Sequence, residues 1–295
     1  MKKFLIFASL IFLITGCTSS IEPQEPQPVV VNGKSKVTVR VSDFSMSMEE
    51  FTTKAATSVT DYAGVKAITL AFYGSNGYEE YKTTQLRADD TTYDTFGEFS
   101  CDLPIGTYTM VVLGYGSQYP ITLTSPTSAS YTEDKVRDTF RKTQTVTVTS
   151  TAALDLSVDL TRTVSKLELI STDALSSGVS YMRLTFGAGG MSFSPSTGLA
   201  TSDTGMSVDI VPTQSVGATI WLGAYVFLAT DAQTMDVTIQ AFDAEDNILF
   251  TKTVEDVSFK RNRVTKLTGS VFTTSTSSAA FSVETDWLDP INVDF

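Results

Sequence analysis

The sequence contains no histidine and only two cysteines among its 295 residues. The absence of histidine removes the commonest general base and metal ligand, so a serine–histidine–aspartate triad is excluded. Two cysteines cannot form a cysteine-based zinc site. If Cys17 is modified, as argued below, Cys101 has no partner for an intrachain disulfide. Cys101 lies in a stretch typical of a strand, and we expect a small buried apolar residue, not a reactive thiol.

Basic residues are also scarce, because 21 lysines and arginines face 33 acidic residues and the formal net charge is −12. Removal of residues 1–16, which contain Lys2 and Lys3 and no acid, makes the charge −14. An acidic surface argues against nucleic-acid binding, which depends on phosphate neutralisation by Lys and Arg. It also argues against docking on anionic lipid headgroups.

No sequence motif of a known catalytic centre is present. There is no glycine-rich phosphate loop and no serine nucleophile elbow. Paired carboxylates can hydrolyse glycosides without histidine, but the three acidic pairs lie in polar stretches where solvated carboxylates are the ordinary explanation: Glu49-Glu50, Glu79-Glu80 and Asp89-Asp90. The spacing of Asp243, Glu245 and Asp246 does not match a calcium-binding EF-hand loop. We therefore expect no enzyme, no catalytic residue, no metal and no cofactor.

The longest apolar run near the N-terminus, Phe4–Ile14, is shorter than the roughly 20 residues that span a bilayer. It follows two lysines and ends in Ile14-Thr15-Gly16-Cys17, an order that resembles the lipobox of bacterial lipoprotein precursors. The pattern predicts a signal peptide over residues 1–16 and lipid attachment at Cys17. Two or more acyl chains such as palmitate give a durable anchor. The Pro-, Gln- and Glu-rich residues 17–34 are then a flexible tether.

Beyond the tether, apolar residues mostly alternate with polar ones, and β-branched residues are abundant. This period of two predicts strands that bury one face. Strands are expected in the first half at Val37–Phe44, Val65–Phe72, Tyr108–Leu113, Gln144–Thr149 and Leu154–Leu160. In the second half they are expected at Val164–Ile170, Ser180–Phe186, Met206–Val211, Ala218–Leu228, Met235–Phe242, Asn247–Val254, Arg263–Phe272 and Ala280–Thr285. Many short strands at regular spacing favour an all-β sandwich architecture.

Two regions are less typical of strands. Ser45–Thr60 is expected to be a loop or one short helix, and the charged stretch Tyr131–Lys142 a short exposed helix with a solvated face. The boundary between two domains is expected near Thr149–Asp155. The predicted organisation is an N-terminal β-sandwich over residues 35–153 and a C-terminal β-sandwich over residues 154–295.

Three internal motifs, together with the leader ending at Cys17, carry a family resemblance. Leu103–Tyr108 matches the pattern L-P-x-G-x-Y, and Leu160–Leu169 is similar to L-x-R-x-V-A-K-[VL]-x-[VL], with Ser165 in place of Ala. Phe259–Gly269 is close to R-N-x-x-T-x-[VL]-x-G. In this combination the chain resembles the fimbrillin-type subunits and anchor lipoproteins of Bacteroidetes type V pili. The motifs span nearly the whole chain, although each occurs widely in β-sandwich lipoproteins.

The same motifs have a physical interpretation of their own. Pro104 presets a turn and Gly106 permits a positive φ, after which Tyr108 begins a buried strand. Asn262 tolerates a left-handed conformation, and Gly269 leaves room for a bulge or a close neighbour. Arg162, beside alternating apolar positions, is expected to make a structural contact between the two domains, with a functional role as the alternative.

The resemblance implies two tandem transthyretin-like, Greek-key-type antiparallel β-sandwiches and assembly by β-strand exchange. It implies a role in cell adhesion as a pilus anchor, minor or shaft subunit, lipid-anchored in the outer membrane at the cell surface or in the fimbrium. The expected partners are other pilus subunits and a host or bacterial surface ligand. In shaft-type relatives an arginine-specific protease removes the first strand, and Arg40 is the best position for such a cut. Anchor-type relatives are not cut, and a plain outward-facing arginine stays the alternative.

Two further alternatives remain open from the residues. The C-terminal segments Phe281–Trp287 and Ile291–Phe295 form either a donor strand or a last strand of their own domain. The rival function is a surface glycan-binding lipoprotein, whose stacking faces would come from Tyr73, Tyr78, Tyr81, Tyr115, Tyr119 and Trp221.

Overall fold

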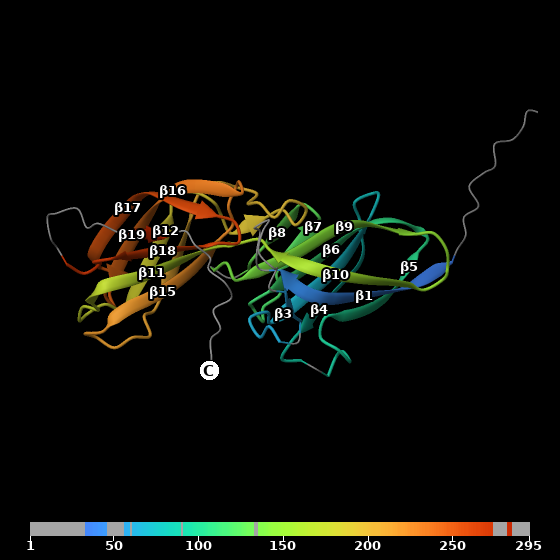
Figure 1. Cartoon of the computed structure of the whole chain (residues 1–295), viewed down its shortest axis with the longest axis horizontal. Coiled ribbons are helices and arrows are strands. Elements are labelled where there is room, and N and C mark those ends of the chain that lie inside the picture. The colour runs from blue at the N-terminus through green and yellow to red at the C-terminus, as the bar shows by residue number, and fades with distance from the viewer. Residues whose placement is uncertain are drawn as a thin grey trace, which may run out of the picture. The chain divides into compact units, whose positions relative to one another are not determined.

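A computed structural model describes residues 33–45, 56–59, 61–89, 91–132, 135–273 and 282–284. Every helix or strand assigned within these ranges is a β-strand (Figure 1). No helix in this part of the chain could cross a membrane. The lipid-attachment residue Cys17 and the whole leader and tether up to residue 32 lie outside the described residues.

Many of the strands follow the alternation of apolar residues along the chain. The first ten are β1 (Lys34–Ser45), β2 (Ala56–Ser58), β3 (Ala67–Gly74), β4 (Glu79–Leu86), β5 (Glu98–Pro104), β6 (Gly106–Tyr115), β7 (Thr122–Ser125), β8 (Ser128–Ser130), β9 (Thr139–Val148) and β10 (Leu154–Arg162). The others are β11 (Ser165–Ala174), β12 (Tyr181–Phe186), β13 (Ser192–Phe193), β14 (Met206–Ile210), β15 (Thr219–Val226), β16 (Ala232–Phe242), β17 (Ile248–Lys260), β18 (Val264–Gly269) and β19 (Ser282–Glu284).

The largest sheet has eight strands in the order β2-β1-β10-β9-β6-β3-β4, with β5 also paired to β1. Strand β1 lies between β5, to which it is antiparallel, and β10, to which it is parallel (Figure 1). The sheet nearly closes on itself, because β4 and β5 approach each other at its two free edges. The first strand of the described residues, β1, is therefore an interior strand of the largest sheet.

Strand β10 covers Leu154–Arg162, the start of the expected C-terminal sandwich. In the structure this strand pairs with β1 and with β9, so it is part of the largest sheet, called the first sheet below. The alternation within Leu154–Leu160 predicts a strand but not its partner, because the parallel pairing with β1 joins residues more than 100 positions apart.

The remaining strands form two four-stranded sheets, β15-β11-β18-β19 and β14-β12-β16-β17, and a small sheet β13-β8-β7. Their inward side chains, such as Leu167, Leu169 and Leu267, are fully buried. They share one hydrophobic cluster with residues of the first sheet, including Val111 and Leu113. A second cluster fills the interior of the first sheet itself.

Polar contacts also tie the first sheet to a later loop. The Arg141 guanidinium on β9 donates hydrogen bonds to the carbonyls of Pro195 and Thr197, each at 2.8 Å. The Thr163 hydroxyl donates to the Gly198 carbonyl at 2.6 Å. Gly198 has a φ of +77°, and an added Cβ would collide with Thr163 and Arg141, so glycine is required for this close approach.

Two local expectations are wrong. Tyr131–Lys142 contains no helix in its described residues: β9 begins at Thr139, and Asp138 is buried instead of solvated. Gly106 does not adopt a positive φ; its lack of a side chain instead admits Tyr108, whose Oη would lie 3.2 Å from an added Cβ. The Tyr108 hydroxyl donates to the Pro104 carbonyl at 2.7 Å, which closes the β5–β6 turn.

Other local expectations agree with the structure or fall mostly outside it. Asn262 adopts a φ of 59° in the turn between β17 and β18. Of Ser45–Thr60, Ser45 ends β1 and Ala56–Ser58 is a strand paired to β1, so the expectation of a loop or short helix is wrong for these residues, while residues 46–55 and Thr60 lie outside the described residues. At the C-terminus, Ser282–Glu284 pairs with β18 of the same chain, while the rest of both C-terminal segments lies outside the described residues.

Candidate functional site between β4 and β5

The free edges of β4 and β5 face each other where the first sheet fails to close. Strand β4 pairs with β3 on one side, and β5 pairs with β1 on one side. Among the described residues, no backbone hydrogen bond joins β4 to β5. An unpaired strand edge exposes peptide donors and acceptors, so this seam is a natural place for recognition.

Gln85 bridges one end of the seam. Its side chain is buried, its Nε2 donates to the Glu98 carbonyl at 2.6 Å, and its Oε1 accepts from the Gly97 N–H at 2.7 Å. A single side-chain amide thus makes the donor and acceptor contacts that a neighbouring peptide group would make. Gly97 has a φ of +90°, and an added Cβ would lie 2.9 Å from Val59 Cγ1, so glycine is needed opposite Gln85.

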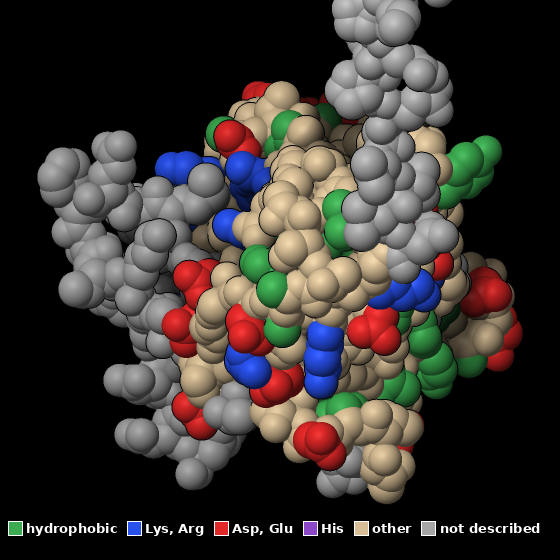
Figure 2. Space-filling view, turned by 90° about the vertical axis from the view of Figure 1, so that its right-hand side faces the viewer, with side chains coloured by type: hydrophobic (Ala, Val, Ile, Leu, Met, Phe, Trp, Pro, Cys, Tyr) green, Lys and Arg blue, Asp and Glu red, His purple; other side chains and the backbone are tan. Residues whose placement is uncertain are grey.

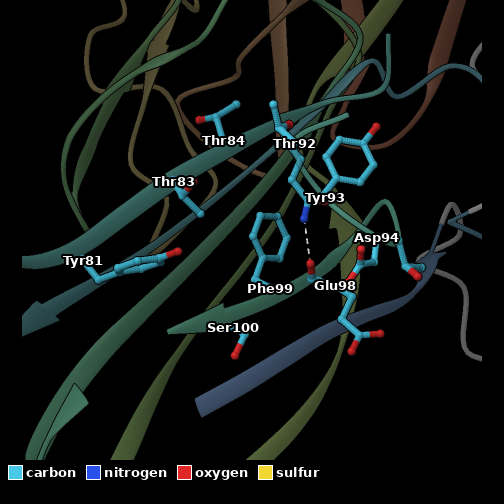
Figure 3. Close-up of a pocket in the computed structure, with 11 residues that line it drawn as sticks. Tyr81, Thr83, Thr84, Thr92, Tyr93, Asp94, Glu98, Phe99 and Ser100 are labelled. Carbon is cyan, nitrogen blue, oxygen red and sulfur yellow. Dashed lines mark hydrogen bonds between the residues drawn. The ribbon is translucent and has the colours of Figure 1, made fainter. Parts of the chain in front are cut away.

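A pocket of about 370 Å³ lies along the seam (Figure 3). Figure 3 shows Tyr81 at one end of the row of lining side chains, Tyr93 at the other and Phe99 between them. The lining residues come from β4, β5 and the loop between them: Tyr81, Thr83, Thr84, Gln85, Thr92, Tyr93, Asp94, Thr95, Glu98, Phe99 and Ser100. Hydroxyl groups, two tyrosine rings and two carboxylates dominate this surface.

Arg40, the predicted processing position, lies on β1 beside this pocket. Its guanidinium is 3.2 Å from the Glu98 carboxylate and 3.5 Å from that of Asp155, and half of its side chain is exposed. Both ion pairs are exposed, so they contribute little to stability. The backbone around Arg40 is paired with β5 and β10, so a protease would need this strand to open first.

Arg162, singled out by its motif, occupies a buried polar cluster. Its Nε and Nη2 donate to the two carboxylate oxygens of Asp138 at 2.7 and 2.8 Å, and Nη2 also donates to the Tyr62 hydroxyl at 2.9 Å. Tyr62 in turn donates to Asp138 at 2.8 Å. Burial, together with the nearby Asp138, raises the pKa of Tyr62 to about 12. The arrangement agrees with the expected structural contact.

Cys101 lies on β5 with its side chain turned into the core. Burial raises the pKa of its thiol to about 11. The protonated thiol is a poor nucleophile near neutral pH, which agrees with the expected buried apolar role.

The six aromatic residues considered for stacking divide into three groups. Tyr73 and Tyr115 are buried in the core. Tyr78, Tyr119 and Trp221 are exposed at separate places, and the Lys166 ammonium already covers the Trp221 ring at 5.2 Å. Of these six aromatic residues, Tyr81 is the one that lines the seam pocket.

Of the acidic groups considered for catalysis or calcium, Glu49, Glu50 and Asp90 lie outside the described residues. Asp243 accepts hydrogen bonds from the backbone N–H groups of Glu245 and Asn247, so its carboxylate closes a turn. No cluster of three or more potential metal ligands occurs among the described residues. Glu79 and Glu80 are exposed on β4.

Sequence reasoning missed most of the pocket. Gln85, Tyr93, Asp94 and Glu98 carried no motif, and the sequence of β4, EEYKTTQL, has no regular apolar alternation. Only the approach of β4 to β5 brings these pocket residues together.

On the face shown in Figure 2, acidic and basic side chains are interspersed with scattered hydrophobic ones, which is an ordinary solvated surface.

These features define an all-β protein of several sheets whose largest sheet nearly closes and leaves one polar seam. Residues 119–294 match a family of unknown function, DUF6562, and the chain belongs to this family. No curated protein matches the sequence.

Solved structures give a fold-level comparison. A DUF1812 protein of Bacteroides thetaiotaomicron, named as a candidate polysaccharide binding protein, aligns with a TM-score of 0.52 at 13% identity over 85% of this chain and 98% of its own. The fimbrial anchor protein Mfa2 of Porphyromonas gingivalis aligns with a TM-score of 0.49 at 10% identity, over 86% and 97% of the two chains. A candidate adhesin of Bacteroides ovatus aligns with 0.48 at 14% identity, over 74% and 77%. At these identities the first comparison establishes a shared fold.

Proposed function

We propose that this chain is a structural component of a cell-surface pilus, held in the outer membrane by a lipid on Cys17 and joined to other subunits by β-strand exchange. Its two halves are transthyretin-like β-sandwiches, and its role is that of an anchor, a minor or a shaft subunit contributing to adhesion. The single observation that carries the proposal is the position of β1 between β5 and β10.

The first half of β1 is suited to replacement by another strand. Val37 and Val39 are fully buried, while Thr38 and Arg40 alternate with them on the outer side. Departure of Lys34–Arg40 would leave β5 without its ladder partner and open apolar positions between β5 and β10. A strand with alternating apolar residues would satisfy both the backbone groups and these positions.

The processing state distinguishes the subunit roles. Mass spectrometry of the protein from its native outer membrane would find an acylated Cys17 on an intact chain if it is an anchor. An N-terminus at Val41 would indicate a processed shaft or tip subunit. A chain with neither an acylated Cys17 nor a new N-terminus would contradict both forms of the proposal.

Strand exchange has its own test on the purified full-length chain in detergent. Limited digestion with an arginine-specific protease should cut after Arg40 and convert monomers into multimers, measured by light scattering. The variant Arg40→Lys is the matched control, because it keeps the positive charge beside Glu98 and Asp155 but is not a substrate. Cut chains that stay monomeric would refute assembly through this strand.

A further inference from the structure

The seam pocket is poorly suited to the strand exchange proposed above. The Gly97 N–H and the Glu98 carbonyl are the groups an added strand would use at that end, and Gln85 already satisfies both. Native sheets protect their edges from further pairing in this way. The Thr84 hydroxyl is likewise engaged, at 2.8 Å from that of Thr69. What remains along the seam is a pocket walled largely by side chains.

The walls offer two kinds of contact that suit a sugar. Hydroxyl groups of Thr83, Thr95 and Ser100 can each donate and accept hydrogen bonds. The Thr92 hydroxyl donates to the Asp89 carbonyl at 3.1 Å and can still accept. Tyr81 and Tyr93 supply ring surfaces, and aromatic side chains combine an apolar face with a polar tip. Figure 3 shows the Phe99 ring between them, but this ring is buried and belongs to the hydrophobic core behind the pocket. A ligand with hydroxyl groups around its edge and apolar C–H faces can make both the hydrogen bonds and the ring contacts.

The charge of the pocket limits the class of sugar. Among the described residues, Asp94 and Glu98 are the charged ones that line it, and none of its described lining residues is a lysine or an arginine. Arg40 does not line the pocket, but its guanidinium lies 3.2 Å from the Glu98 carboxylate and offsets part of that charge. Carboxylates accept hydrogen bonds from sugar hydroxyls but repel uronate, sulfate and phosphate groups.

We propose that the seam between β4 and β5 binds a short segment of a neutral polysaccharide. Tyr81 stacks on a sugar ring, and Asp94 accepts hydrogen bonds from its hydroxyls. The volume of about 370 Å³ falls in the range of small-ligand pockets. The site gives the protein a ligand-binding function separate from assembly through β1.

Affinity electrophoresis of the full-length chain in detergent tests the proposal. Native gels would contain a neutral polysaccharide, namely xylan, yeast mannan, laminarin or amylopectin, or an acidic one, namely polygalacturonate or heparin. At least one neutral polymer should retard the wild-type chain, and neither acidic polymer should. Titration calorimetry with oligosaccharides of the retarding polymer then gives the dissociation constant.

Two variants and one control locate the site. Tyr81→Ala should raise the dissociation constant about tenfold through loss of one stacking face. Asp94 is exposed in the loop between β4 and β5, so Asp94→Ala should change stability little and should also weaken binding. Tyr78→Ala is the matched control, because Tyr78 is 73% exposed and does not line the pocket. Arg40→Lys should bind as the wild type does, which separates this test from that of assembly.

Several outcomes would overturn the proposal. They are the absence of retardation by every neutral polymer, stronger retardation by an acidic polymer, and unchanged binding in both Tyr81→Ala and Asp94→Ala. A synthetic peptide of residues 281–295 could also be tested. If it binds the wild type but not Asp94→Ala, the seam accepts an added β-strand and not a sugar.

Discussion

Replacement of Arg162 by methionine should lower the free energy of unfolding by about 4 kcal/mol at pH 7, because it leaves the Asp138 charge buried without its partner. The side chains of Arg162 and Asp138 are only 4% and 9% exposed, and two hydrogen bonds of 2.7 and 2.8 Å join them. The guanidinium also lies 4.7 Å from the centre of the Phe140 ring, a contact that methionine cannot reproduce. Tyr62 would keep one hydrogen bond to Asp138.

The structure offers a matched control in Arg183. Its Nε lies 2.7 Å from Asp209, the same distance as in the buried pair, but the two side chains are 36% and 47% exposed. Arg183→Met should therefore cost about 0–1 kcal/mol, as exposed ion pairs do. Because the two ion pairs have the same Nε–carboxylate distance, the difference between the two losses of unfolding free energy reports the effect of burial.

Urea unfolding followed by tryptophan fluorescence measures both variants, provided that the slope of the transition stays unchanged. The double variant Arg162→Met with Asp138→Asn should recover part of the loss, because no uncompensated charge remains. Equal losses in Arg162→Met and Arg183→Met would refute the reasoning, as would a double variant less stable than the sum of the single changes.

Three further predictions follow from local contacts. Asp173 accepts hydrogen bonds from the N–H groups of Val271 and Phe272 and from two hydroxyls, and these outweigh burial and lower its pKa to about 2. Asp173→Ala should therefore lower the free energy of unfolding above pH 4. In urea titrations, the difference in free energy from the wild type should shrink as the pH falls from 3.8 towards 2. A difference that does not change with pH would contradict this. Gln85→Ala should lower stability by about 1–3 kcal/mol in the same assay, because two backbone groups lose their partner, and no loss would count against the bridge. Cys101 should resist iodoacetamide at pH 7.4 in the native protein and react in urea, as mass spectrometry can follow; rapid native labelling would contradict its burial.

The strands could largely be predicted because their signal is local. In β1, β10 and β12, inward residues such as Val39, Val158 and Leu184 alternate with outward ones, and burial of one face requires that pattern. The left-handed Asn262 was also predictable, because its short amide tolerates that conformation without help from distant residues.

Which strands pair with each other, and which polar groups are buried, could not be predicted from local patterns. Asp138 sits in a charged stretch that suggests a solvated helix, yet it is buried because β9 extends beside β6 and Arg162 arrives from β10. Likewise, β4 has no apolar alternation, since it is an edge strand with a wet face. The sequence by itself determined an acidic, histidine-free, all-β chain. Only the tertiary structure decided that β1 pairs with β10 and that β4 and β5 form the seam, because those contacts join distant segments whose pairing no local pattern encodes.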